Sequence, residues 1–125
     1  ERADLFSAIL SLAGNASTGV PCEPSQPINI LHVHGDADAS VPYAGAMASF
    51  DTWKAKNACT GASEAGPDLD LDTVTDGAET DTSHATGCPD GGAVELWHIA
   101  NGTHIPSFTN AWEPAMWSWF TSHHR

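Results

Sequence analysis

Two short motifs carry the residues of this chain that are best suited to catalysis. Residues 34–43 read HGDADASVPY and include Asp38, and residues 101–106 read NGTHIP and include His104. A histidine that is oriented by a carboxylate can take a proton from an attacking nucleophile, as the base of an acyl-transfer hydrolase does. We therefore assign Asp38 as the candidate catalytic acid and His104 as the candidate catalytic base.

A nucleophile is the third group that this chemistry needs. Serine hydrolases of the α/β type place their serine in a Gly-x-Ser-x-Gly turn, and their chain order is serine, acid, histidine. Asp38 precedes His104, as that order requires, but no Gly-x-Ser-x-Gly occurs before Asp38. Residues 61–65, GASEA, come closest, yet they lack the second glycine and follow Asp38. We therefore expect the serine to lie before residue 1, and residues 1–125 alone to be inactive as an esterase.

Apolar runs and amphipathic segments must position these residues. Three segments have the composition of buried strands, namely residues 6–12, 28–34 and 93–99. Two others carry apolar side chains at helical spacing, namely residues 43–57 and 110–123. The order strand, strand, helix, strand, helix predicts an α/β fold with a mostly parallel sheet and covering helices.

The two candidate residues should meet at one edge of this sheet. The carboxyl ends of parallel strands lie together, and open α/β sheets place their sites there. Asp38 follows the strand that ends at His34 by four residues, and His104 follows Ile99 by five. We expect the Asp38 carboxylate roughly 3–4 Å from His104 Nδ1. There is an alternative for each residue: Asp38 would cap the following helix, and His104 would be an exposed loop histidine. Asp36 is expected to bond its own backbone in a turn.

Both motifs resemble segments of polyhydroxybutyrate depolymerases and feruloyl esterase-like α/β-hydrolases. Residues 34–43 are similar to that family's His-Gly-x-x-Asp-x-x-Val-Pro-Tyr segment. Residues 101–106 are similar to its Gly-Gly-His-x-Pro segment, with Asn101 where the family prefers glycine. Residues 1–14, residues 53–59 and the region of Cys88 also resemble its pattern. The resemblance implies that Asp38 is the triad acid and His104 the triad base.

The resemblance also implies a fold, an activity and a partner. The chain would be the C-terminal half of a single α/β-hydrolase domain, residues 1–125, and the missing N-terminal half would carry the nucleophile and the oxyanion hole. The complete enzyme would be a secreted serine esterase that needs no cofactor. Its substrates would be polyhydroxyalkanoates, or feruloyl and acetyl esters of plant cell-wall polysaccharide. A non-catalytic remnant or a binding module built on such a hydrolase is the alternative.

Metal binding is a further alternative. His32, His34 and Asp36 follow the His-x-His-x-Asp start of the metallo-β-lactamase ligand motif and would be the metal ligands of a metal-dependent hydrolase. That motif needs a histidine immediately after the aspartate, and alanine stands there. Residues 68–79 place carboxylates at several positions of a calcium loop, but the sixth position is threonine rather than glycine. Because both patterns are incomplete, we expect no bound metal.

Charge and composition argue against other classes of protein. The net charge is −12 and only four residues are Lys or Arg, so the chain lacks the cations that bind nucleic-acid phosphates. No apolar run approaches the roughly 20 residues that span a membrane. Seven of the sixteen acidic residues fall within residues 64–81, which predicts a solvated loop. We expect residues 58–78 to be loop and residues 79–87 to be a short polar edge strand.

The three cysteines indicate the compartment. Cys59 and Cys88 bracket the acidic segment, and a disulfide between them would close a loop of about 30 residues and contribute roughly 3 kcal/mol. Cys22 would then pair with a cysteine outside this chain. Three reduced thiols in a cytosolic protein are the alternative. The expected disulfide and the resemblance together predict an extracellular protein.

Overall fold

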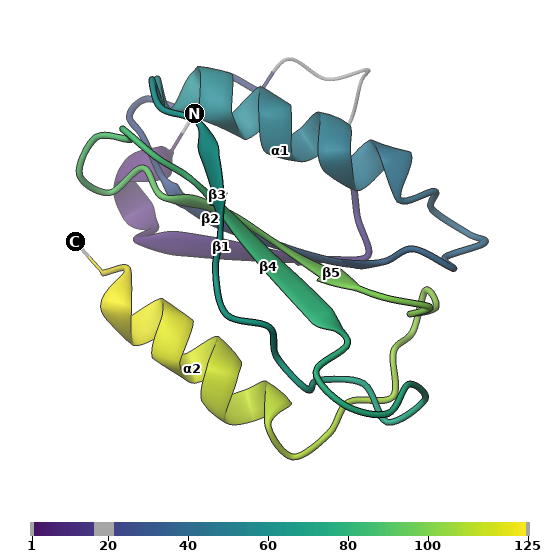
Figure 1. Ribbon diagram of the computed structural model, residues 1–125. Helices are drawn as coiled ribbons and strands as arrows, with labels where there is room; N and C mark the ends of the chain where they lie inside the picture. The colour runs from purple at the N-terminus through teal and green to yellow at the C-terminus, as the bar shows by residue number, and fades with distance from the viewer. Residues whose placement is uncertain (1, 17–21, 125) are drawn as a thin grey trace.

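The computed structural model describes residues 2–16 and 22–124, which form a five-stranded sheet with a helix on each face (Figure 1). The strand order across the sheet is β1-β2-β5-β4-β3. The elements in chain order are the 3-10 helix η1 (Ala3–Leu5), β1 (Ala8–Leu12), β2 (Asn29–Gly35), α1 (Ala44–Lys56), β3 (Ser63–Ala65), β4 (Thr80–Ala85), β5 (Val94–Ile99) and α2 (Trp112–Ser122).

The sheet is mixed, which corrects the predicted fold class. Strands β1, β2 and β5 are parallel neighbours, whereas β4 pairs antiparallel with both β5 and β3. The prediction of a mostly parallel, α/β-hydrolase sheet is therefore wrong, and the fold is a small mixed α/β sheet. The connection from β4 to β5 spans only residues 86–93, which is too short for the crossover that parallel pairing requires.

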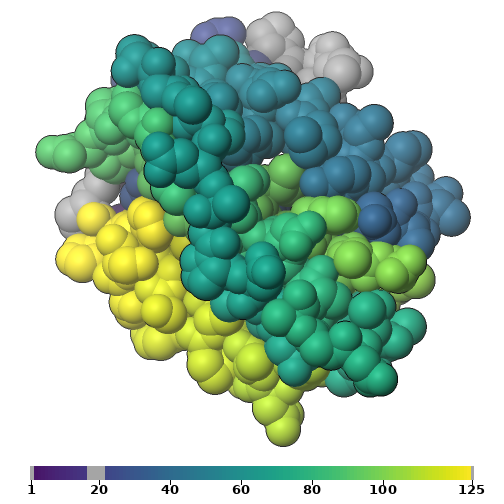
Figure 2. Space-filling view, in the orientation of Figure 1, coloured from purple at the N-terminus to yellow at the C-terminus, as the bar shows by residue number. Residues whose placement is uncertain are grey.

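The segment predicted as loop and edge strand explains the difference. Residues 58–78 contain the short strand β3, and β4 lies inside the sheet between β5 and β3 rather than at its edge. Figure 2 shows this segment, in teal, between α1 (blue) and α2 (yellow) on the visible face of the molecule. Its acidic part is only partly solvated, because Leu71, Asp72 and Glu79 are buried. The Glu79 carboxylate accepts hydrogen bonds from the backbone amides of Leu71 and Asp72 and from the Thr80 hydroxyl.

Each helix covers one face of the sheet with a separate apolar cluster. Ala46 and Phe50 of α1 pack against Val94 and Leu96 of β5, together with Ala85. Trp119 of α2 packs on the opposite face in a cluster with Leu31, Val33, Leu71, Trp97 and Ile99. Successive side chains of a strand point to opposite faces, and every residue of β2 is buried, so both faces of this central strand are covered. Among the described residues, no helix has the length and apolar character needed to cross a membrane.

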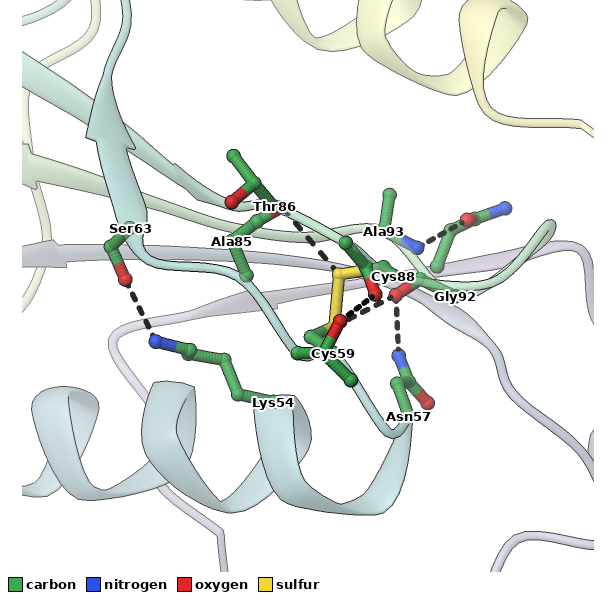
Figure 3. Close-up of a disulfide and its surroundings, with 12 residues drawn as sticks. Lys54, Asn57, Cys59, Ser63, Ala85, Thr86, Cys88, Gly92 and Ala93 are labelled. Carbon is green, nitrogen blue, oxygen red and sulfur yellow. Dashed lines mark hydrogen bonds between the residues drawn. A yellow bond between two sulfur atoms is a disulfide. The ribbon is translucent and has the colours of Figure 1, made fainter.

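The predicted disulfide between Cys59 and Cys88 is confirmed (Figure 3). It joins the residues that follow α1 to the connection that precedes β5. The neighbouring Asn57 side chain donates hydrogen bonds to the carbonyls of Ile28 and Gly92, which fixes the same end of the sheet. Within the described part of the chain Cys22 is a free cysteine. A disulfide is consistent with an oxidising, extracellular location.

Candidate acid–base site

The ends of β2 and β5 bring the two predicted motifs together. The strands are parallel and in register, with His34 beside His98 and Gly35 beside Ile99, so their carboxyl ends coincide. The loops that follow are tied by backbone hydrogen bonds, from the Ala37 amide to the Gly102 carbonyl at 3.0 Å and from the Asp36 amide to the Ile99 carbonyl at 3.2 Å.

The approach of these two loops leaves no room for side chains at their crossing point. A Cβ atom on Gly35 would lie 2.1 Å from the Gly102 carbonyl oxygen, which is far inside van der Waals contact. Asn101, which directly precedes Gly102, has a φ of +59°. Asparagine adopts this left-handed conformation more readily than most residues. The glycines of both motifs and Asn101 therefore set the spacing between the two loops.

Asp38 and His104 make the predicted contact. His104 Nδ1 lies 2.9 Å from Asp38 Oδ2. The Asp38 side chain is completely buried, and its Oδ1 accepts hydrogen bonds from the amides of Ser40 and Val41, both at 2.8 Å. The alternative in which Asp38 caps the helix is wrong, because α1 begins at Ala44 and no side chain caps it.

These contacts keep Asp38 ionised. Burial of the carboxyl group opposes ionisation, but hydrogen bonds from the Val41 amide, the His104 ring and the Ser40 amide outweigh it and lower the pKa of Asp38 to about 2. An ionised carboxylate can only accept hydrogen bonds. The proton between the two side chains therefore belongs to His104 Nδ1.

His104 presents its other nitrogen to the surface. The ring is 41% exposed, whereas the Asp38 carboxylate that orients it is 0% exposed. Since Nδ1 carries the proton of the neutral ring, Nε2 carries a lone pair. No side chain or backbone group in residues 2–16 and 22–124 hydrogen-bonds to this Nε2. The arrangement can accept a proton at Nε2 and stabilise the resulting imidazolium through Asp38.

Two buried histidines extend this pair into the core, a connection that sequence reasoning missed. His34 Nε2 lies 2.9 Å from the Val41 carbonyl and 3.1 Å from Asp38 Oδ2. His34 Nδ1 lies 3.3 Å from His32 Nε2, and the two rings are stacked. The sequence signal was a His-x-His pair in one strand, which places both rings on the same face. Burial, and then the neighbouring His34, lower the pKa of His32 to about 4.

A second histidine–carboxylate group lies beside the first. His98 Nε2 is 3.1 Å from Asp36 Oδ2, and His98 Nδ1 is 3.4 Å from Asp81 Oδ2 on β4. Asp36 also accepts the Asn101 amide at 2.7 Å. The expectation that Asp36 bonds its own local backbone is wrong, because the loop after β5 comes close enough to supply the donor. The Tyr43 ring packs on His98 with the centroids 4.6 Å apart.

The residues considered for metal binding do not converge. His32 and His34 direct ring nitrogens at each other, whereas Asp36 faces His98. In the acidic segment, carboxylate oxygens of Asp72 and Glu79 accept hydrogen bonds from backbone amides. Within the described ranges, no group of three or more His, Cys, Asp or Glu side chains is arranged to hold a metal ion.

The described residues supply no nucleophile for His104. No serine, threonine or cysteine side chain among them hydrogen-bonds to its ring. Ser63, in the GASEA segment, lies in the edge strand β3, and its Oγ accepts a hydrogen bond from Lys54 Nζ at 2.9 Å (Figure 3). The site therefore consists of an acid, a base and the loops that hold them.

No model of a known protein family matches this chain, and no curated protein matches its sequence.

Proposed function

We propose that Asp38 and His104 are the acid and base of a secreted serine esterase. The observation that carries this proposal is the 2.9 Å contact between a fully buried carboxylate and a partly exposed imidazole whose Nε2 has no partner in the described chain. Hydrolytic triads use a carboxylate and a histidine in this relation. The resemblance of both motifs to polyhydroxybutyrate depolymerases and feruloyl esterases also supports the proposal.

The chemistry follows from the position of the protons. His104 Nε2 takes the proton of a serine hydroxyl as the serine oxygen attacks the ester carbonyl. His104 then gives this proton to the oxygen of the departing alcohol as the carbonyl–oxygen bond breaks. Water, deprotonated by the same nitrogen, then attacks the acyl carbonyl. The bond from the carbonyl carbon to the serine oxygen breaks, and His104 returns the proton to that oxygen as the acid leaves. Asp38 keeps the proton of the neutral ring on Nδ1 and stabilises the imidazolium in both steps.

The proposal assigns the nucleophile to a segment outside these 125 residues. The same segment would supply the backbone amides of the oxyanion hole. The substrate would be a carboxylic ester of a polyester or of plant cell-wall polysaccharide, hydrolysed outside the cell without a cofactor. Residues 1–125 alone would be an inactive part of this enzyme, and such a chain could persist as a remnant that has no activity.

Ester hydrolysis tests the proposal. We expect the purified 125-residue chain to hydrolyse p-nitrophenyl butyrate no faster than buffer does. A longer product of the same reading frame that includes the residues before residue 1 should hydrolyse it. Turnover by the 125-residue chain that is lost in His104→Ala would contradict the placement of the nucleophile. A longer product that contains a Gly-x-Ser-x-Gly turn and folds, yet has no activity, would contradict the esterase itself.

A further inference from the structure

We propose that His34 is a positioning residue that holds the Asp38 carboxylate toward His104. His34 is completely buried at the end of β2, and its Nε2 faces both the Val41 carbonyl at 2.9 Å and Asp38 Oδ2 at 3.1 Å. Asp38 Oδ2 is the same oxygen that His104 contacts. The proposal rests on the proposed function for its catalytic meaning, whereas its geometric content concerns this chain alone.

The neighbours of His34 Nε2 determine where its proton lies. The Val41 carbonyl and an ionised Asp38 carboxylate are both acceptors, so a lone pair on Nε2 would be repelled by each of them. His34 therefore carries a proton on Nε2 and donates it to Val41 with Asp38 close by. Its other nitrogen, Nδ1, then accepts a hydrogen bond from His32 Nε2 at 3.3 Å. His32 thus fixes the tautomer of His34 from the core side.

Val41 links this donor to the carboxylate. Its carbonyl accepts from His34, and its amide donates to Asp38 Oδ1 at 2.8 Å. One imidazole therefore anchors both the turn that follows Asp38 and the side of the carboxylate that faces His104. The Tyr43 ring lies edge-on to His34, with the ring centroids 6.0 Å apart. The turn has a fixed attachment to β2 as a result, and Asp38 cannot rotate away without losing these contacts.

Nitrogen-15 NMR on the wild-type chain tests the tautomer directly. We expect the Nε2 atom of His34 to carry a proton and its Nδ1 atom to carry none, and we expect His104 to carry its proton on Nδ1. An Nδ1–H tautomer at His34 would overturn the proposal, because the donor to Val41 and the proton beside Asp38 would then be missing. This measurement needs no variant and no ester hydrolysis, so its outcome is separate from that of the esterase assay.

Two substitutions then separate positioning from packing. His34→Gln keeps an N–H donor that can reach the Val41 carbonyl, whereas His34→Leu keeps the apolar bulk and removes the donor. We expect the Nδ1 proton of His104 to exchange with water about tenfold faster in His34→Leu and at close to the wild-type rate in His34→Gln. His84→Gln, which removes a histidine of β4 without a side-chain contact to the pair, is the matched control.

A role in packing alone gives a different result. In that case both His34 variants lower stability to urea, and the exchange of the His104 proton stays at the wild-type rate in each. That result would overturn the proposal. If His34→Leu does not fold, the His34→Gln variant and the wild-type tautomer decide. A folded His34→Gln in which the His104 proton exchanges at least about tenfold faster than in wild type would also overturn the proposal, because the retained donor should preserve the slow exchange.

Discussion

The two histidine–carboxylate groups at the end of β2 and β5 differ in which ring nitrogens are engaged. His104 contacts one buried carboxylate through Nδ1, and its Nε2 has no partner in the described part of the chain. His98 has a carboxylate at each nitrogen, Asp36 at 3.1 Å and Asp81 at 3.4 Å. These two carboxylates are 41% and 69% exposed.

The difference shows what makes a histidine at this edge a candidate base. A base needs a lone pair that faces the substrate, and His98 has carboxylates beside both of its nitrogens. The groups around His98 connect β2, β4 and the loop after β5, so they act as a cross-link. Burial adds a second distinction. The buried Asp38 charge acts on His104 in a medium of lower dielectric constant than the medium in which the exposed Asp36 and Asp81 act on His98.

Removal of the disulfide should lower stability and leave both histidine groups in place. Cys59 and Cys88 are 29 residues apart in sequence, and loss of a cross-link of that span costs about 3–4 kcal/mol in the free energy of unfolding. Urea denaturation of Cys59→Ala/Cys88→Ala measures the loss, with Cys22→Ala as the control. The NMR signals of His98 and His104 should not shift, since the bridge lies at the opposite end of the strands. A loss below about 1 kcal/mol would contradict this role of the bridge.

Acid should destabilise the protein through His32, which contacts the Asp38–His104 group through His34 and makes no contact with the His98 group. Its pKa is about 4 in the folded chain and 6.5 in the unfolded reference, so the unfolded chain binds more protons between these values. The stability is therefore fully present above pH 6.5 and is lost as the pH falls toward 4, by about 3 kcal/mol in total. The contribution of Asp38 lies in a separate window below about pH 4.

Urea denaturation at pH 7, 5.5 and 4.5 measures this loss. His32→Gln should flatten the pH dependence in that range, and His84→Gln should keep it because the buried imidazole is still present. An identical slope in wild type and His32→Gln would show that another group carries the acid sensitivity.

Asp38→Asn should lower the reactivity of His104. The asparagine amide can donate to Nδ1, which moves the ring proton to Nε2 and removes the reactive lone pair; in a complete triad the same change costs about 10⁴ in kcat. We expect labelling of His104 by diethyl pyrocarbonate, followed by peptide mass spectrometry, to slow by at least about tenfold. In the wild-type chain His104 should be labelled faster than His98. Equal labelling rates of these two histidines would remove the contrast between the groups.

Asp36→Asn should have the smallest effect. The side-chain oxygen of asparagine can still accept a hydrogen bond from the Asn101 amide, and partly exposed polar contacts such as that with His98 contribute little. We expect less than about 1 kcal/mol of lost stability and an unchanged labelling rate at His104. A slowed labelling of His104 in Asp36→Asn would show that the two groups act as one unit.

The elements with strong hydrophobic patterns could be predicted from the sequence. Strands β1, β2 and β5 and both helices match the expected segments to within two residues at each end. Strands β3 and β4 are polar and contain no apolar residue other than alanine, so their pairing depends on long-range hydrogen bonds that periodicity does not show. The error in the fold class follows from these two strands.

The candidate site was predictable to a similar degree. Position at the carboxyl ends of two parallel strands, together with the resemblance of both motifs to a hydrolase family, predicted the contact between Asp38 and His104. The contacts of His34 and Asp36 were not predictable, because they depend on how a turn folds back on β2 and on how closely the loop after β5 approaches it. Such tertiary contacts leave no periodic signal in the sequence.

The most direct test is ester hydrolysis by a longer product of the same reading frame that includes the residues before residue 1. His104 and His98 are replaced by alanine in two separate variants. We predict that His104→Ala lowers kcat for p-nitrophenyl butyrate by about 10³-fold or more, as loss of a triad member does. His98→Ala should lower it by less than about tenfold, because that ring is part of a cross-link outside the chemistry. Retained activity in His104→Ala, or equal losses in the two variants, would contradict the assignment of His104 as the base.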